Sequence, residues 1–397
     1  MVNPYFCYAA SFSVALILYP LGWSDLYPPL STALVFFLLF TIGAHVVAGI
    51  RFKQTGKSSF RKLDPGMIRS APLLVTVFLY ALWIAEFIYG EGVPLFKILL
   101  KEPYDYKLFG IPSLHVFIVT FSSFYTIFLF HKFLSHRSRY LLALFLINLS
   151  AAILIYNRGM FLFNLSGVAL MFLIYNRKFS IRQFAVGLTG GLVILFLFGV
   201  LGTARVSNES RVPYSNELFM KTGSASNTFR NSAIPQEYFW TYMYATSPLA
   251  NLEINATENR PETINIASFV EWGNNEVLFD FISKRVNMLT GEKTLKVITI
   301  RGPFNASTVY ARSFSYLGWW GLFLMATVVL VVPMIYIRLL TPASPFFLTG
   351  LVILSTVFLF MVFENTLRFT GLSFQLVYPI VMSTGCRLIP QVRKIFL

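Results

Sequence analysis

Long apolar stretches separated by short polar connections occupy most of this chain of 397 residues. A helix that crosses a bilayer needs roughly 20 mostly apolar residues, and ten stretches approach or reach that length. The predicted spans cover residues 4–22, 29–50, 70–90, 111–131, 140–156, 159–175, 183–203, 308–337, 345–363 and 369–386. The pattern therefore predicts an all-α, polytopic integral membrane protein with about ten transmembrane helices.

One long polar segment, residues 204–312, interrupts this pattern between the seventh and eighth spans. We expect short helices in it: one led by Pro235, a second capped by the Ser247-Pro248 pair, and a third capped by Asn275. The predicted organisation is seven helices in residues 1–203, a loop domain in 204–307 and three helices in 308–397. The N-terminus lacks the basic start and the cleavage site of a signal peptide, so the first apolar stretch is expected to remain as a helix.

The net charge of +15 is unevenly distributed among the connections. Half of the 32 Lys and Arg residues lie in alternate connections and in the C-terminal tail, where Asp64 is the single acid. These basic residues are Arg51, Lys53, Lys57, Arg61, Lys62, Arg69, Lys132, Arg137, Arg139, Arg177, Lys178, Arg182, Arg338, Arg387, Arg393 and Lys394. Cytoplasmic connections carry such an excess. Both termini are therefore expected in the cytoplasm, with the long segment on the outer side, and the charge indicates topology rather than a nucleic-acid partner.

Four arginines are expected at the outer boundary of the membrane. Arg158 and Arg368 fall at the tips of two helical hairpins, and Arg205 and Arg312 at the two ends of the long segment. Guanidinium groups stay protonated and bind phosphate oxygens with a planar set of donors. The set predicts a site for a phosphate or pyrophosphate, although each arginine alone could equally be an interfacial anchor.

Several other residues are candidates for the same site. Glu86 and His115 are expected near the outer ends of two spans, where either could serve as a general base or play a structural role. Secondary candidates are Arg211, Arg230, Arg301, Tyr310 and Glu364. The spacing of Glu364 and Arg368 is also that of a simple ion pair on one helical turn.

The sequence contains no glycine-rich phosphate loop, no His-Glu-x-x-His motif, no Cys/His cluster and no Asp-x-Asp pair. Nucleotide-dependent and metal-assisted chemistry therefore have no support, and no cofactor is expected. The two cysteines, Cys7 and Cys386, lie in apolar stretches near opposite chain ends and define neither a disulfide framework nor a metal site. The predicted spans also lack mid-span charged residues, which counts against an ion-coupled transporter.

Short motifs follow one another along the chain, at residues 92–96 (Gly-Val-Pro-Leu-Phe), 109–112 (Phe-Gly-Ile-Pro), 157–159 (Asn-Arg-Gly), 201–205 (Leu-Gly-Thr-Ala-Arg), 244–251 (Tyr-Ala-Thr-Ser-Pro-Leu-Ala-Asn), 311–312 (Ala-Arg) and 316–321 (Tyr-Leu-Gly-Trp-Trp-Gly). In these motifs, their order and the pattern of spans, the chain resembles the Wzy-type O-antigen or oligosaccharide repeat-unit polymerases. Residues 364–368 match only the general expectation of outer arginines.

This resemblance implies a membrane glycosyltransferase with a GT-C-like fold at the periplasmic face of the bacterial inner membrane. Its substrates would be oligosaccharides linked to undecaprenyl pyrophosphate. A hydroxyl group of one unit would attack the anomeric carbon of the growing chain, and undecaprenyl pyrophosphate would leave. Arg158, Arg205, Arg312 and Arg368 would then bind the pyrophosphate, with Glu86 or His115 as the base.

Three alternatives remain open. An O-antigen ligase would share the donor chemistry but transfer to a lipid A core. A flippase for lipid-linked sugars would also bind a lipid pyrophosphate but would need a hydrophilic path through the membrane. A non-catalytic scaffold of a polysaccharide assembly complex would tolerate loss of the arginines. The expected partners are the lipid-linked substrates, the bilayer, and the chain-length regulator and flippase of the same pathway.

Overall fold

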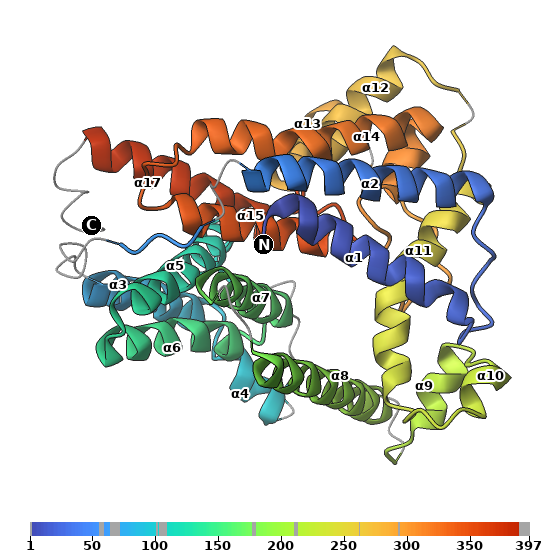
Figure 1. Ribbon diagram of the computed structural model, residues 1–397, viewed down its shortest axis with the longest axis horizontal. Coiled ribbons are helices and arrows are strands. Elements are labelled where there is room, and N and C mark those ends of the chain that lie inside the picture. Colours follow the sequence, from blue (N-terminus) through green and yellow to red (C-terminus); the bar gives the residue numbers. More distant parts are fainter. Residues whose placement is uncertain are drawn as a thin grey trace.

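A computed structural model describes residues 2–54, 59–63, 72–100, 102, 109–176, 180–209, 213–261, 263–292 and 294–388. These residues form helices and connecting turns, with no strand among them beyond one isolated bridge between Ser24 and Ala225. Figure 1 shows a bundle of long helices with shorter helices gathered at one end. The predicted all-α class is confirmed.

Seven helices of the described chain are long and apolar enough to cross a membrane. They are α1 with its 3₁₀ extension η1 (Pro4–Leu18 and Tyr19–Leu21), α2 (Thr32–Gln54), α3 (Pro72–Tyr89), α5 (Leu114–His136), α7 (Arg158–Tyr175), α8 (Ile181–Glu209, of which Ile181–Ala204 is the apolar part) and α14 (Ala311–Leu339). Two further apolar helices are shorter, α6 (Arg139–Leu154) and α15 (Phe347–Phe360). The predicted number of ten spans stays a prediction.

The last predicted span, residues 369–386, is not one helix. It consists of α16 (Thr370–Ser373), η4 (Phe374–Leu376) and α17 (Val377–Leu388). The break places the Arg368–Thr370 backbone against the long polar segment, because the Asp280 N–H donates to the Arg368 carbonyl at 2.9 Å. The apolar pattern predicted this region but not its break.

Helix α15 lies at the centre of the bundle, packed against α1, α5 and α7. Every residue from Phe347 to Phe358 is buried, so the helix is apolar on all sides because protein surrounds it. By contrast, α8 has exposed side chains along most of its length. In a bilayer, that surface would face lipid.

The polar segment consists of helices and connecting turns, although only part of the predicted set is found. They are α9 (Asn216–Thr222), α10 (Asn227–Arg230), α11 (Tyr238–Glu258), α12 (Ile266–Trp272), the π-helix η3 (Gly273–Val277) and α13 (Asp280–Thr290). Two predicted caps are wrong. Pro248 lies inside α11, whose buried face packs on α1, α8 and α14, and this packing outweighs the loss of one helical hydrogen bond. Asn275 lies within η3, and α13 begins at Asp280.

Residues 298–306 lie along α11 and are held there by the side chains of Asn251 and Asn255, which are one helical turn apart. The Asn251 Nδ2 donates to the Phe304 and Ala306 carbonyls, both at 2.6 Å, and its Oδ1 accepts from the Ile300 N–H at 2.8 Å. Asn255 bonds both the N–H and the carbonyl of Ile298, at 3.0 and 2.7 Å. These amides satisfy buried backbone groups as a neighbouring strand would, and they fix the approach to α14.

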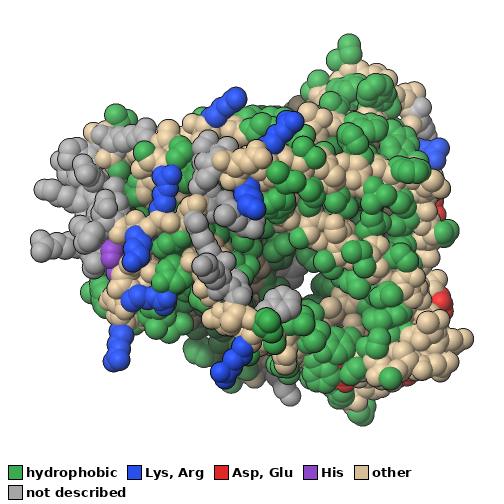
Figure 2. All heavy atoms as spheres, viewed as in Figure 1, with side chains coloured by type: hydrophobic (Ala, Val, Ile, Leu, Met, Phe, Trp, Pro, Cys, Tyr) green, Lys and Arg blue, Asp and Glu red, His purple; other side chains and the backbone are tan. Residues whose placement is uncertain are grey.

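The charged side chains are distributed unevenly over the surface. Figure 2 shows Lys and Arg gathered over the part of the bundle that holds the C-terminal end of α2 and the start of α6, whereas Asp and Glu are visible at the other end. The side of a membrane that each end faces stays a prediction. The end with the short helices, called the polar end below, contains α9–α13, and the opposite end is called the basic end.

Candidate functional site

Glu86 and His115 form a hydrogen-bonded pair between α3 and α5. The Glu86 Oε2 lies 2.8 Å from the His115 Nδ1. Glu86 is completely buried, whereas the His115 side chain is 26% exposed. A carboxylate that accepts from Nδ1–H fixes the tautomer in which Nε2 carries the lone pair. The pair can therefore take up a proton from a hydroxyl group that reaches Nε2, and the carboxylate stabilises the imidazolium that results.

The Phe-Gly-Ile-Pro motif at residues 109–112 holds this pair in place. The Ile111 N–H donates to the other Glu86 oxygen at 3.3 Å, and the Phe109 ring lies edge-on to His115 at 5.6 Å. Gly110 has φ +96°, and a Cβ built there would lie 2.5 Å from the His115 Nδ1. Glycine is needed at this position for both its conformation and its lack of a side chain.

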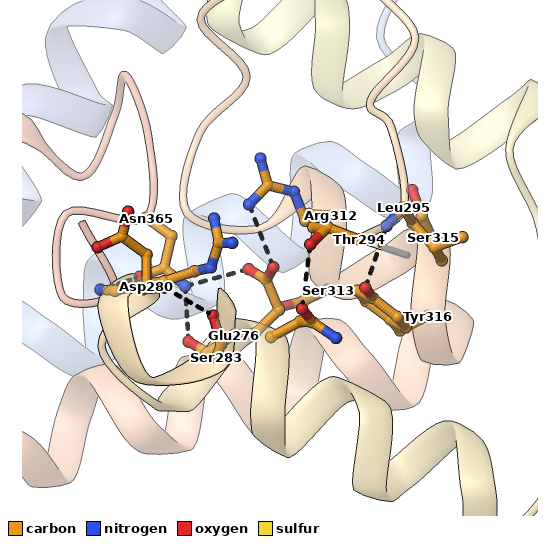
Figure 3. A network of polar contacts seen from close by, with 12 residues as sticks. Glu276, Asp280, Ser283, Thr294, Leu295, Arg312, Ser313, Ser315, Tyr316 and Asn365 are labelled. Atoms are coloured by element: carbon orange, nitrogen blue, oxygen red, sulfur yellow. Dashed lines mark hydrogen bonds and ion pairs between the residues drawn. The ribbon is translucent and has the colours of Figure 1, made fainter. Parts of the chain in front are cut away.

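Arg312 and Glu276 form a second pair, an ion pair whose atoms lie 3.4 Å apart (Figure 3). Arg312 lies in the first turn of α14, and Glu276 lies in η3. Glu276 is fully buried, while the Arg312 side chain is 22% exposed. The Arg312 Nε is buried and has no hydrogen-bond partner among the described residues. The guanidinium is therefore held by the carboxylate with donor capacity left over.

Asn365 and Arg368 complete the surroundings of Glu276. The Asn365 Nδ2 donates to the Glu276 Oε2 at 3.1 Å and to its backbone carbonyl at 2.8 Å (Figure 3). Burial raises the pKa of the Glu276 carboxyl above its usual value, and the positive charges of Arg312 and Arg368 oppose that shift. Both guanidiniums act on the Glu364 carboxyl as well, so two arginines and two carboxyls meet here. The Nε of Arg312 and the Nε of Arg368 have no partner among the described residues, and such free donors suit an anion with several oxygens.

Asp280 ties the start of α13 to the turn that carries Arg368. The Asp280 Oδ1 accepts hydrogen bonds from the N–H of Thr370, at 3.0 Å, and from its hydroxyl. Its Oδ2 accepts from Lys284 at 2.9 Å. Burial alone would raise the pKa of the Asp280 carboxyl, but the hydrogen bonds from Thr370 and Lys284 hold it below its usual value.

Helix α13 also connects the Glu86–His115 pair with the Glu276–Arg312 pair. The Arg285 Nη2 donates to the Ser113 hydroxyl at 3.3 Å, two residues before His115. Phe374 contacts Phe117 on α5 edge-on at 5.3 Å and Phe281 on α13 at 5.8 Å. The Glu86–His115 pair and the Glu276–Arg312 pair therefore flank the same helix at the polar end of the bundle, and together they form the candidate site.

Arg158 stands at the tip of the hairpin of α6 and α7, as predicted. Asn157 caps α7 by accepting from the Met160 N–H at 2.9 Å, which places Arg158 in the first turn. Met160 packs in one small apolar cluster with Trp83 and Ile118, on the helices that carry Glu86 and His115. The exposed Arg158 guanidinium stacks on Tyr156 at 4.9 Å and donates to its hydroxyl at 2.7 Å. Arg158 is thus near the Glu86–His115 pair but has no described contact with it.

The backbone of Arg205 lies in α8, six residues beyond Gly199, but its side chain is outside the described part of the structure. Its motif has a packing role: Gly202 lies against Trp240, and the Trp240 Nε1 donates to the Thr203 hydroxyl at 3.0 Å. Arg211 lies outside the described residues altogether.

Three secondary candidates have structural contacts away from this site. Arg230 binds both Glu217 oxygens, at 2.9 and 3.0 Å, and the Arg301 Nη1 donates to the Thr222 carbonyl at 2.7 Å. Both interactions hold α9 in place at the polar end. Tyr310 is fully buried, and its hydroxyl bonds that of Tyr8 on α1.

The segment between α15 and α16 is a series of turns, so Glu364 and Arg368 do not share a helical turn. The structure contains no ion pair between these two residues. Glu364 is exposed, whereas the Arg368 Nε is buried without a partner among the described residues. The ion pair predicted on one helical turn does not form. The protein surroundings raise the pKa of the Glu364 carboxyl and the positive charges of Arg312 and Arg368 oppose that shift, so Glu364 and Arg368 both lie with the Glu276 cluster.

Sequence reasoning missed Glu276, Asn365 and Asp280. A signal was present for Glu276, since Asn274, Asn275 and Glu276 form a polar run shortly before the amphipathic helix α13. The run was interpreted as a helix cap, whereas the π-helix turns Glu276 inward. No group of three or more His, Cys, Asp or Glu side chains in the described chain is arranged to hold a metal ion.

Comparison with protein-family models, curated proteins and solved structures finds no match for this chain. Functional inference therefore rests on the geometry of the site and on the sequence motifs.

Proposed function

We propose that this protein is an O-antigen polymerase of the Wzy type. It would join oligosaccharide repeats linked to undecaprenyl pyrophosphate at the periplasmic face of the inner membrane. The observation that carries the proposal is the pairing of a carboxylate-oriented histidine, His115, with the guanidiniums of Arg312 and Arg368 at the same end of the bundle. The motifs at residues 109–112 and 157–159 support it by their positions around that site.

In the proposed reaction, His115 Nε2 accepts the proton of an acceptor sugar hydroxyl. The acceptor oxygen then forms a bond to the anomeric carbon of the donor chain, and the bond from that carbon to the pyrophosphate oxygen breaks. Arg312 and Arg368 stabilise the charge that develops on the departing pyrophosphate. Pyrophosphate is a good leaving group, so the protein's main contribution is to position both substrates and to receive this charge.

The test is polysaccharide synthesis in a bacterial strain whose own polymerase is deleted and whose repeat unit the protein accepts. Wild type is compared with His115→Gln and Arg368→Ala at matched membrane expression. Arg301→Ala is the matched control, because Arg301 binds a carbonyl of α9 outside the site. We expect wild type and Arg301→Ala to restore a ladder of chain lengths, and the site variants to leave a single repeat on the lipid A core.

Two results would contradict the proposal. A full ladder from both site variants would remove the site from the reaction and favour a scaffold. Loss of even the single capped repeat, when the protein is absent, would mean that the protein acts in ligation or in transport of the lipid-linked unit.

A further inference from the structure

A small cavity lies at the basic end of the bundle. It has a volume of about 140 Å³ and is lined by residues of two connecting segments and of helices α5 and α15. The lining residues are Arg61, Lys62, Leu63, His131, Pro342, Ala343, Ser344, Pro345, Phe347 and Leu348. Sites for whole small-molecule ligands are typically roughly 300–1,000 Å³, so this cavity fits a headgroup-sized ligand.

The cavity and the candidate site lie at opposite ends of the same helices. Helix α5 begins beside His115 and carries His131 in its last turns. Helix α14 begins beside Arg312 and ends at Leu339, three residues before Pro342. Helix α15 runs back from Phe347 at the cavity toward the turn that carries Asn365. The cavity is therefore not part of the site already described.

Arg61 is fixed in place at this cavity. Its backbone carbonyl lies 2.9 Å from the His131 Nε2, and its Nη1 donates to the Pro342 carbonyl at 2.7 Å. The opposite ring nitrogen of His131 lies 3.2 Å from the Thr349 hydroxyl. The carbonyl contact uses one of the five N–H donors of a guanidinium. An exposed lysine, Lys62, follows directly.

The lining also matches a ligand with an apolar part. Phe347 and Leu348 begin α15, and the helix has no side-chain cap at its start. Cationic side chains beside apolar ones at the end of a membrane bundle are the combination that binds anionic lipid headgroups. No acidic side chain is among the lining residues.

We propose that this cavity binds the phosphate group of an anionic membrane lipid. Arg61 and Lys62 neutralise the phosphate, and the apolar start of α15 contacts the adjoining acyl region. Phosphatidylglycerol has this chemistry, and free phosphate shares only the charged part. The proposal does not depend on the proposed function, because it concerns the other end of the molecule.

The test uses the full-length purified protein in nanodiscs and in detergent, with bound lipids counted by native mass spectrometry. The probes are phosphatidylglycerol, the zwitterionic phosphatidylcholine, and inorganic phosphate. The variants are the double substitution Arg61→Ala/Lys62→Ala, and Ala343→Trp, which adds a bulky ring at the cavity lining and keeps the charges. The control is Arg51→Ala/Lys53→Ala, which removes two exposed cations of the last turn of α2 outside the cavity.

We expect wild type and control to retain phosphatidylglycerol over phosphatidylcholine, and the Arg61→Ala/Lys62→Ala variant to bind it roughly 10- to 30-fold more weakly. Ala343→Trp should also bind phosphatidylglycerol more weakly than wild type does. If inorganic phosphate competes with phosphatidylglycerol for wild type, and this competition needs Arg61 and Lys62, the cavity is an anion site. The phosphate group of the lipid is then sufficient for binding. Equal retention of the two lipids by wild type, or unchanged retention by both variants, overturns the proposal.

Discussion

Two of the buried carboxylates at the polar end of this protein, those of Glu86 and Glu276, have different partners. Glu86 is bonded to a histidine, whose second ring nitrogen can accept a proton. Glu276 is bonded to an arginine, which cannot. The first arrangement can therefore move a proton, whereas the second can only hold charge. In one reaction site these two tasks are complementary, and the proposed glycosyl transfer needs both.

The largest effect is expected from Arg312→Ala. The substitution removes a proposed ligand for the leaving group and breaks the ion pair of the buried Glu276; removing one partner of a buried pair costs about 3–5 kcal/mol of stability. We expect loss of the polysaccharide ladder together with a lower thermal unfolding temperature.

A second substitution separates the two consequences. Arg312→Ala/Glu276→Gln removes the unpaired charge, so most of the stability should return while polymerisation stays absent. Return of polymerisation with stability would show that Arg312 matters only for folding.

His115→Gln should act on the rate alone. Proton transfer by a positioned side chain contributes roughly 10²–10⁴-fold, and glutamine can still donate a hydrogen bond to the Glu86 carboxylate. We therefore expect a comparable loss in the initial rate of chain extension, with the unfolding temperature nearly unchanged. A loss of stability as large as that of Arg312→Ala would mean that the two carboxylates have the same structural role.

Gly110→Ala tests whether the position of His115 matters. The new Cβ meets the imidazole, and the backbone there has positive φ. A displacement of a catalytic group by about 1 Å can cost on the order of 10²-fold in rate. Gly302→Ala is the control, since a Cβ at Gly302 meets no atom within 4 Å. Equal rates for the two alanine variants would argue against a role for the motif in positioning the histidine.

The smallest effect is expected from Asp280→Asn, and it should depend on pH. The pKa of the Asp280 carboxyl is lowered in the folded protein, so its ionised form stabilises the fold above its ordinary pKa of 3.8 and loses that contribution as the pH falls through the lowered value. Wild type should unfold at a higher temperature than Asp280→Asn at pH 7, and the gap should narrow toward pH 3. A gap of constant size would mean that the amide disturbs packing instead.

The membrane helices could be predicted from the sequence because a span is defined by length and apolarity alone. The predicted stretch at residues 159–175 corresponds to α7, Arg158–Tyr175, within one residue at its start. Arg158 could be placed for the same reason, because a polar tripeptide between two apolar stretches has to be a turn.

The helices of the long polar segment could not be predicted to the same detail. Pro248 lies in mid-helix because tertiary packing outweighs a local rule, and Glu276 points inward because a π-helix changes the angular position of its side chains. The Glu86–His115 contact joins residues on different helices, so sequence could name both residues but not their bond. The lack of an ion pair between Glu364 and Arg368 depends on a break in the helix that apolar periodicity does not reveal.

The most direct test of the central claim is a reaction with purified protein in nanodiscs. Undecaprenyl-pyrophosphate-linked repeat units are supplied in a buffer with EDTA and no nucleotide, and the released undecaprenyl pyrophosphate is measured alongside the length of the saccharide. The proposed site predicts that wild type produces dimers and longer chains with one lipid pyrophosphate released per linkage, and that His115→Gln slows both in parallel. Wild-type protein that is folded and binds these units, yet forms no linkage and releases no lipid pyrophosphate, would contradict it.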